Sequence, residues 1–146
     1  MTCLGLGSCV SVCALDAVAD VSGMAHIMLP KSFSGTTPEH FGKFADTGIP
    51  QLIAQMEELG ADRDRILLAL VGGAKVRTPE GSYHNLDIGS RNAQAVLQVI
   101  AELELSCLAH DLGGSMSRSV TLASDSGKVV VRTISQGEDL LCNFRG

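Results

Sequence analysis

The chain has 146 residues, of which 45% are apolar and 3% aromatic, and it carries a net charge of −5. This length predicts one domain, residues 1–146, with an aliphatic core large enough to need no disulfides. Because Lys and Arg form no cluster, we expect no nucleic acid partner and no membrane insertion. No apolar stretch approaches the ~18 residues of a membrane span.

The five cysteines favour a reducing compartment. Their number is odd, they form no C-x-x-C pair, and no secretory signal is visible, so we expect free thiols in a cytoplasmic protein. They are Cys3, Cys9, Cys13, Cys107 and Cys142.

The N-terminal half predicts a hairpin and then a helix. Residues 4–8 enter as a short strand, residues 9–16 and 21–29 form the hairpin, and Pro30 ends it because proline cannot donate to a ladder. Residues 44–59 show helical periodicity, although Pro50 suggests that the continuous helix begins only near Ile49. Gly60 fits the left-handed position after its end. The expected buried stripe is Ile49, Leu52, Ile53, Met56 and Leu59.

The C-terminal half adds a buried strand at residues 66–71, a polar loop at residues 77–87 and a second helix at residues 90–103, capped by Ser90. The apolar stripe of this helix is Ala93, Val96, Leu97, Ile100 and Leu103. A strand, a hairpin and a polar tail follow at residues 106–109, 119–123 with 128–134, and 135–146. Hairpins at both ends exclude a doubly wound fold. We expect an α/β protein of the α+β type, with mixed, largely antiparallel β-sheet layers and two main helices packed on them.

Cys9 and His26 lie at mirror-image positions about the turn of the first hairpin. If the turn is centred between Ala17 and Val18, paired residue numbers sum to 35, and Cys9 stands opposite His26 with Cβ atoms ~4.5–5.5 Å apart. A loop longer by two residues makes the sum 37, and His26 becomes a diagonal neighbour of Cys9 on the same face. A slip of one residue would separate them. We therefore expect an even-numbered loop.

A thiol beside an imidazole is a nucleophile beside its base. The turn formed by Gly7 and Ser8 could direct backbone N–H groups at an oxyanion. Glycine in this turn would also let a substrate backbone approach closely.

Other residues of these types have simpler explanations. Cys13 shares a strand face with Cys9 and is expected to pack in the core. Cysteine spacing disfavours a metal site built from Cys3, Cys9 and Cys13 with His26, so we expect no metal and no cofactor. His110 and Asp111 are adjacent on a strand and point to opposite faces. His40 and His84 lie in expected loops.

Short motifs follow one another in a distinctive order along nearly the whole chain. They are LGLGSCV at residues 4–10, GMAHIMLP at 23–30, Ile-Pro at 49–50, GGA at 72–74, IGSRN at 88–92, DLGG at 111–114, and Arg118. This order resembles the chemoreceptor glutamine deamidases of the CheD family.

The resemblance implies that Cys9 and His26 are the catalytic pair. It also implies hydrolysis of glutamine side-chain amides to glutamate on the cytoplasmic helices of chemoreceptors, and a CheC-type phosphatase as partner. The family has a Thr six residues before the nucleophile as a third catalytic member. Here Cys3 holds that position and Thr2 lies beside it, so both are candidates. Ser117 replaces the Gly that usually precedes Arg118, and family chains usually have more residues before this motif.

Two further functions fit the same residues. One is a non-catalytic regulatory module that binds a CheC-type phosphatase, and the other is a cysteine peptidase or acyltransferase. We expect an active Cys9 to be alkylated faster than Cys107 or Cys142, because a nearby imidazolium lowers the pKa of a thiol.

Overall fold

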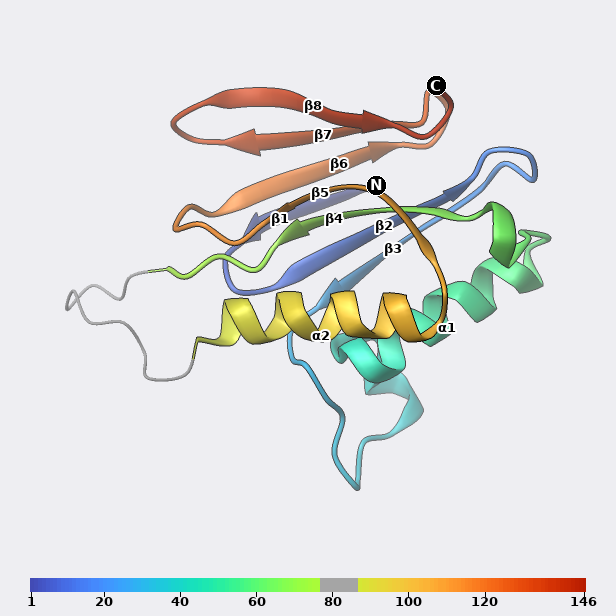
Figure 1. Ribbon diagram of the computed structural model, residues 1–146, viewed down its shortest axis with the longest axis horizontal. Helices are drawn as coiled ribbons and strands as arrows, with labels where there is room; N and C mark the ends of the chain where they lie inside the picture. The colour runs from blue at the N-terminus through green and yellow to red at the C-terminus, as the bar shows by residue number, and fades with distance from the viewer. Residues whose placement is uncertain (77–86) are drawn as a thin grey trace.

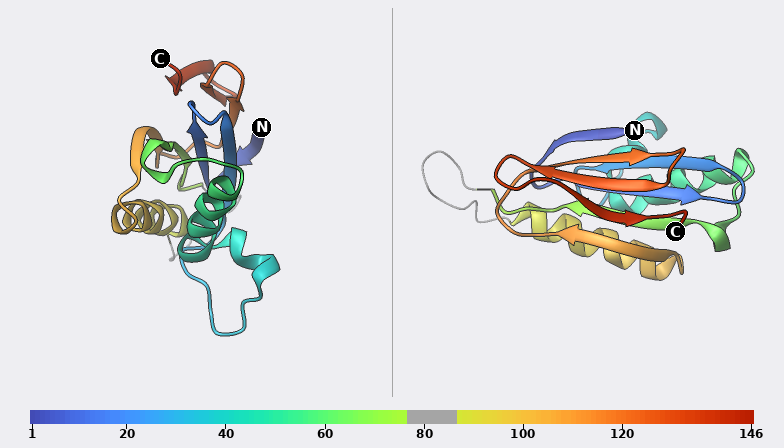
Figure 2. Two further views of the ribbon diagram at one scale, coloured as in Figure 1. Left: turned by 90° about the vertical axis from the view of Figure 1, so that its right-hand side faces the viewer. Right: turned by 90° about the horizontal axis from the view of Figure 1, so that it is seen from above.

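The computed structural model describes residues 1–76 and 87–146. Within these ranges the chain forms three layers: one four-stranded sheet, a second four-stranded sheet, and the helices α1 and α2 on the outer face of the second sheet (Figure 1). The side view keeps the layers distinct, with the first sheet at the top and the helices below, whereas in the view from above the layers overlap (Figure 2, left and right). The expected α+β architecture is confirmed.

The strand order of the first sheet is β1-β6-β7-β8, and its strands are Thr2–Leu6, Arg118–Ala123, Lys128–Thr133 and Gly137–Asn143. The order of the second sheet is β3-β2-β4-β5, with strands Val21–Ile27, Val10–Asp16, Leu67–Gly72 and Ser106–Leu112. Among the described pairs, β4 and β5 run parallel and the others antiparallel. The helices of the described ranges are α1 Ala45–Glu58, α2 Ile88–Glu102, and the short 3₁₀ segments Pro38–Lys43 and Arg63–Arg65.

β2 lies at the centre of the second sheet, and all seven of its residues are buried. Val10, Val12 and Ala14 face the helices, whereas Cys13 and Leu15 face the first sheet. This alternation follows from the two-residue period of a strand. The predicted strand at residues 66–71 shows the same burial on both faces, as β4.

Helix α1 packs as expected through Ile49, Leu52, Ile53 and Met56, and Gly60 takes a positive φ of 103° after its end. Two details of the helix predicted at residues 44–59 were wrong. Leu59 is 73% exposed, and the helix begins at Ala45 and passes through Pro50. Proline in the second turn removes one helical N–H, and the bond it loses is the one to the carbonyl of Asp46.

Helix α2 begins two residues earlier than expected. Its N-cap is Asp87, whose carboxylate accepts from the N–H of Ser90, so the predicted cap at Ser90 was wrong. Its buried face is Gly89, Asn92, Val96 and Ile100, while Leu97 is 42% exposed. The buried stripe is therefore rotated toward Asn92.

The predicted polar tail was also wrong, because Gly137–Asn143 forms strand β8 and pairs with β7. Most of the loop expected at residues 77–87, including His84, lies outside the described residues. His40, which was expected in a loop, lies in the 3₁₀ segment Pro38–Lys43 and is exposed. None of the helices in the described ranges has the length and apolar character needed to cross a membrane.

Candidate active site

The first hairpin places Ser11 opposite His26, and Val10 opposite Ile27. Paired numbers sum to 37, so the register centred between Ala17 and Val18 was wrong and the wider one holds. Its loop, residues 17–20, has four members, which confirms the expected even number. Residues two apart on a strand share a face. Cys9, just before β2, therefore lies on the same face as Ser11 and His26, toward the first sheet.

His26 contributes an unpartnered nitrogen to this face. Its Nε2 is buried and makes no hydrogen bond to any described residue. Buried polar atoms without a partner are rare, because each one loses its bonds to water. Such an atom is available to take up or hold a proton.

The thiol of Cys9 is half-buried beside the hydrophobic cluster between the two sheets. Burial raises its pKa, and a hydrogen bond with the Ser8 side chain opposes this effect without cancelling it. The expectation of a pKa lowered by an imidazolium was therefore wrong. The resting thiol is protonated at neutral pH, and a base must remove its proton before it can attack.

The candidates for a third catalytic member lie on opposite faces of β1. Cys3 packs against the cluster between the sheets, and its Sγ donates to Sδ of Met24 at 3.3 Å. Met24 precedes His26 by two residues and shares its face. Thr2 is exposed, and its hydroxyl bonds to that of Thr121 at 3.0 Å. Cys3, and not Thr2, therefore faces the space between the sheets toward which Cys9 and His26 also point.

Cys13 is fully buried between the sheets, as expected for a packing residue, and burial raises its pKa to about 12. His110 and Asp111 are not a pair: Asp111 forms an ion pair with Arg118 at 3.1 Å, whereas His110 lines a shallow pocket beside α2.

The turn before Cys9 is held by three consecutive carbonyl groups. The carbonyl of Gly7 accepts from the N–H of Ala74 at 2.9 Å, and that of Cys9 from the N–H of Gly73 at 2.8 Å. Between them, the carbonyl of Ser8 accepts from Nδ2 of Asn92 at 2.9 Å. The turn is therefore anchored at each residue by segments distant in sequence.

Glycines make these backbone contacts possible. A Cβ on Gly72, which has a φ of 122°, would lie 2.1 Å from the carbonyl oxygen of Cys9. A Cβ on Gly89 would lie 2.2 Å from the carbonyl oxygen of Ala74. Strand β4 ends, and α2 begins, with backbone packed directly on backbone beneath the Cys9 turn.

Arg118 supports the same corner from the first sheet. Its side chain is largely buried, and it donates to the carbonyl oxygens of Gly72 at 3.3 Å and Gly113 at 2.7 Å while pairing with Asp111. Arg118 therefore joins the ends of β4 and β5.

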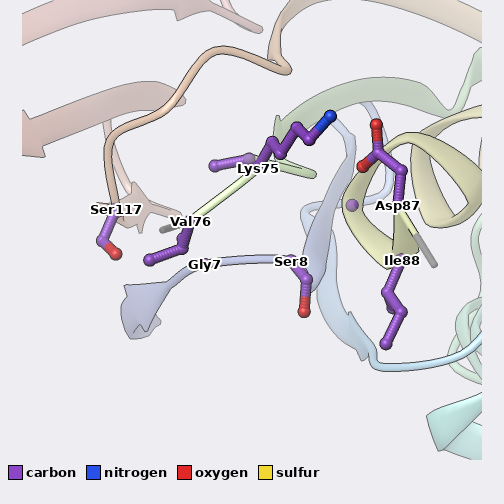
Figure 3. A pocket seen from close by; sticks show the side chains of 9 residues that line it. Gly7, Ser8, Lys75, Val76, Asp87, Ile88 and Ser117 are labelled. Carbon is purple, nitrogen blue, oxygen red and sulfur yellow. The ribbon is translucent and has the colours of Figure 1, made fainter. Parts of the chain in front are cut away.

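A pocket of about 350 Å³ opens beside the turn (Figure 3). In Figure 3, Gly7 and Ser8 lie between Ser117 and Val76 on one side and Ile88 on the other. The described residues that line the pocket are Gly7, Ser8, Ala74, Lys75, Val76, Asp87, Ile88, Gly89 and Ser117. Cys9 is not among these lining residues, whereas Ser8, which immediately precedes it, is.

Asn92 is the site residue to which the sequence analysis gave no role. The motif at residues 88–92 includes Asn92 but does not predict its contact with the Cys9 turn. A signal was present: Gly89, Asn92, Val96 and Ile100 follow a helical period, and a polar residue within a buried stripe indicates a bound partner.

Comparison with known proteins gives a consistent assignment. The chain matches the family described as "CheD chemotactic sensory transduction" over residues 28–133. It is 40% identical over 137 residues to the chemoreceptor glutamine deamidase CheD of Thermotoga maritima, covering 94% of this chain and 83% of that protein. It is 38% identical over 139 residues to a probable chemoreceptor glutamine deamidase CheD of Symbiobacterium thermophilum, covering 94% and 84%. The chain belongs to the CheD family, and the resemblance seen in its motifs is confirmed.

Proposed function

We propose that this chain is a chemoreceptor glutamine deamidase acting in chemotaxis, and that residues 1–146 form one domain with Cys9 as nucleophile and His26 as general base. The hairpin register carries this proposal, because it places Cys9 and an imidazole with an unpartnered buried nitrogen on one face. The names of the relatives support the substrate class.

The first half of the reaction forms a thioester. His26 takes the proton of the Cys9 thiol, and the sulfur attacks the side-chain carbonyl carbon of a receptor glutamine. The tetrahedral oxyanion then collapses, the C–N bond breaks, and the imidazolium returns its proton to the departing ammonia. Because the pKa of the thiol is raised, the attack depends on removal of its proton by His26.

The second half hydrolyses the thioester and leaves a glutamate side chain on the receptor. His26 takes a proton from water, the hydroxide attacks the thioester carbonyl, and the C–S bond breaks. The Cys9 thiolate then recovers the proton from the imidazolium. No cofactor enters this sequence of steps.

The anchored turn supplies the oxyanion donors. In a trans peptide the C=O and N–H bonds point in opposite directions. Since the carbonyls of Gly7 and Ser8 point at Ala74 and Asn92, the N–H groups of Ser8 and Cys9 point away from these anchors. Two adjacent N–H groups that both point away from the anchors suit a developing negative charge.

A chemoreceptor substrate implies action at the cytoplasmic face of the membrane, and we include a cytoplasmic location and a CheC-type phosphatase partner in the proposal. Converting an amide to a carboxylate changes the local charge of a receptor helix by one unit, and this change can bias a signalling equilibrium.

A non-catalytic regulatory module is the second candidate. The bond between Cys3 and Met24 favours it, since the third catalytic position of the family is then engaged elsewhere. Mass spectrometry of a receptor fragment separates the two functions. The deamidase shifts the fragment to the mass of the glutamate form, whereas the module leaves the mass unchanged. A peptidase would cut the fragment.

A further inference from the structure

Asn92 joins the two chain segments on which the proposed catalytic residues lie. Its side chain is fully buried in α2. Its Nδ2 donates to the carbonyl oxygen of Ser8 at 2.9 Å and to that of Met28 at 2.9 Å. Ser8 immediately precedes Cys9, and Met28 follows His26 by two residues. One amide group therefore links the turn before the thiol to the strand end after the imidazole.

This link lies just where the strand ladder ends. The pairing of β2 with β3 begins at Val10 and Ile27, so Cys9 and Met28 are outside it. The pairing of β2 with β4 also ends at Val10. Beyond these residues, the separation of the two segments is no longer fixed by ladder hydrogen bonds. Among the residues that the structure describes, the Asn92 amide is the side chain that bonds to both segments.

The chemistry of the side chain determines its orientation. Both partners are carbonyl oxygens, which only accept hydrogen bonds, so the amide must present its NH₂ group to them. Both N–H bonds are used, one for each segment. A carboxylate of the same shape has no hydrogen to donate and would place negative charge against two carbonyl oxygens.

The other end of the amide argues against a purely packing role. Oδ1 of Asn92 is buried and has no hydrogen-bond partner among the described residues. Such an atom is left with the full loss of its hydration. Val96 and Ile100 fill the same buried stripe with apolar groups. The chain has an amide at this position although one end of that amide is unsatisfied.

We infer that Asn92 is a positioning residue for the proposed deamidation, fixing the Cys9 turn relative to the strand that carries His26. The inference rests on the proposed function. By binding the Ser8 carbonyl, Asn92 also sets the direction of the Cys9 N–H, which is in the same peptide group. Loss of the bridge should therefore slow the chemical step more than it weakens substrate binding.

The test compares Asn92→Asp with Asn143→Asp, using the full chain and a receptor fragment that contains the target glutamine. Asn92→Asp keeps the shape but removes both donors. Asn143→Asp makes the same change at an asparagine whose oxygen accepts from the N–H of Arg145, a bond that a carboxylate preserves. Circular dichroism and active-site titration give the folded, active fraction for each variant, and kcat and KM are measured separately.

For Asn92→Asp we expect kcat per folded molecule to fall about 10²-fold, the effect of a misplacement of about 1 Å, with KM changed by less than about threefold. The control should stay within about threefold of the unaltered chain in both constants. If Asn92→Asp fails to fold, Asn92→Ala removes the donors without adding charge. We again expect kcat to fall while KM changes little.

A folded Asn92 variant with an unchanged kcat overturns the inference, as does a loss confined to KM or to the folded fraction. These results differ from failure of the proposed function, in which the unaltered chain itself leaves the receptor fragment at its original mass. In that case the inference fails together with the function.

Discussion

The thiol of Cys3 donates a hydrogen bond to the thioether sulfur of Met24, 3.3 Å away. Met24 lies two residues before His26 on the same face of β3, and Nε2 of His26 has no partner among the described residues. The side chain at position 3 therefore faces the sheet surface that carries His26, but its thiol bonds to Met24 and not to the unpartnered imidazole nitrogen.

Cys3→Thr is expected to increase kcat. A hydroxyl is a stronger donor and acceptor than a thiol, and one net hydrogen bond of about 1 kcal/mol to the base corresponds to about a fivefold rate increase. Cys3→Val is the matched control, because valine has the shape of threonine without the hydroxyl. Equal rates for the Thr and Val variants would show that position 3 only packs.

Gly72→Ala should both destabilise the fold and displace the nucleophile. The new Cβ would lie 2.1 Å from the carbonyl oxygen of Cys9, at a φ of 122° that alanine rarely adopts. We expect a loss of more than about 2 kcal/mol in the free energy of unfolding, measured in urea, together with loss of deamidation. Gly137 also has a positive φ, of 75°, but a Cβ added there meets no atom within 4 Å. Gly137→Ala should therefore show only the smaller cost of the strained backbone. Equal losses in the two variants would contradict the proposed contact.

Alkylation of Cys9 should report a protonated resting thiol. Because burial raises its pKa, the rate of its reaction with iodoacetamide should keep rising as the pH passes 9. Cys13, whose pKa is raised to about 12 and whose side chain is fully buried, should react far more slowly in the folded chain. Peptide mapping after labelling at a series of pH values gives both profiles. A Cys9 rate that levels off below pH 7 would instead indicate a preformed thiolate.

The hairpin shows how much of the site follows from sequence. Strand alternation and an even-numbered loop are enough to place Cys9 and His26 on one face, and that part was predictable. The exact register was not, because it depends on Asp16. Its carboxylate accepts from the N–H groups of Val18 and Ala19, and this local turn makes residues 17–20 the loop.

Two other features that the sequence did not predict, strand β8 and the partners of Asn92, have comparable physical causes. β8 is an edge strand whose residues 137–140 are exposed, so its composition resembles a tail although its backbone pairs with β7. The partners of Asn92 come from segments 84 and 64 residues away, and such contacts have no signature in local periodicity.

Stability should fall in acid through Asp16. Burial alone would raise the pKa of its carboxyl, but the Arg65 guanidinium and the N–H groups of Asp62, Ala19 and Val18 outweigh burial and hold the pKa well below its usual range. A carboxyl whose pKa is lowered by folding stabilises the fold above its unfolded pKa, near 4, and this stabilisation is lost as the pH falls further. Urea midpoints between pH 6 and pH 3 measure it.

In Asp16→Asn, the decline of the urea midpoint between pH 6 and pH 3 should be smaller, and stability at pH 6 should be lower than in the unaltered chain. Asp64→Asn, at an exposed position in the 3₁₀ segment that also carries Arg65, provides the control and should leave the acid profile unchanged. An unchanged acid profile in Asp16→Asn would show that other carboxylates govern acid unfolding.

The most direct test of the account is the mass of a receptor fragment after incubation with the unaltered chain, Cys9→Ala or His26→Ala. We predict that the unaltered chain moves the fragment to the glutamate mass without cutting it and that both variants, folded by circular dichroism, leave it at the glutamine mass. Full conversion by folded Cys9→Ala, or no conversion by the unaltered chain, would contradict a thiol-dependent deamidase built on this hairpin.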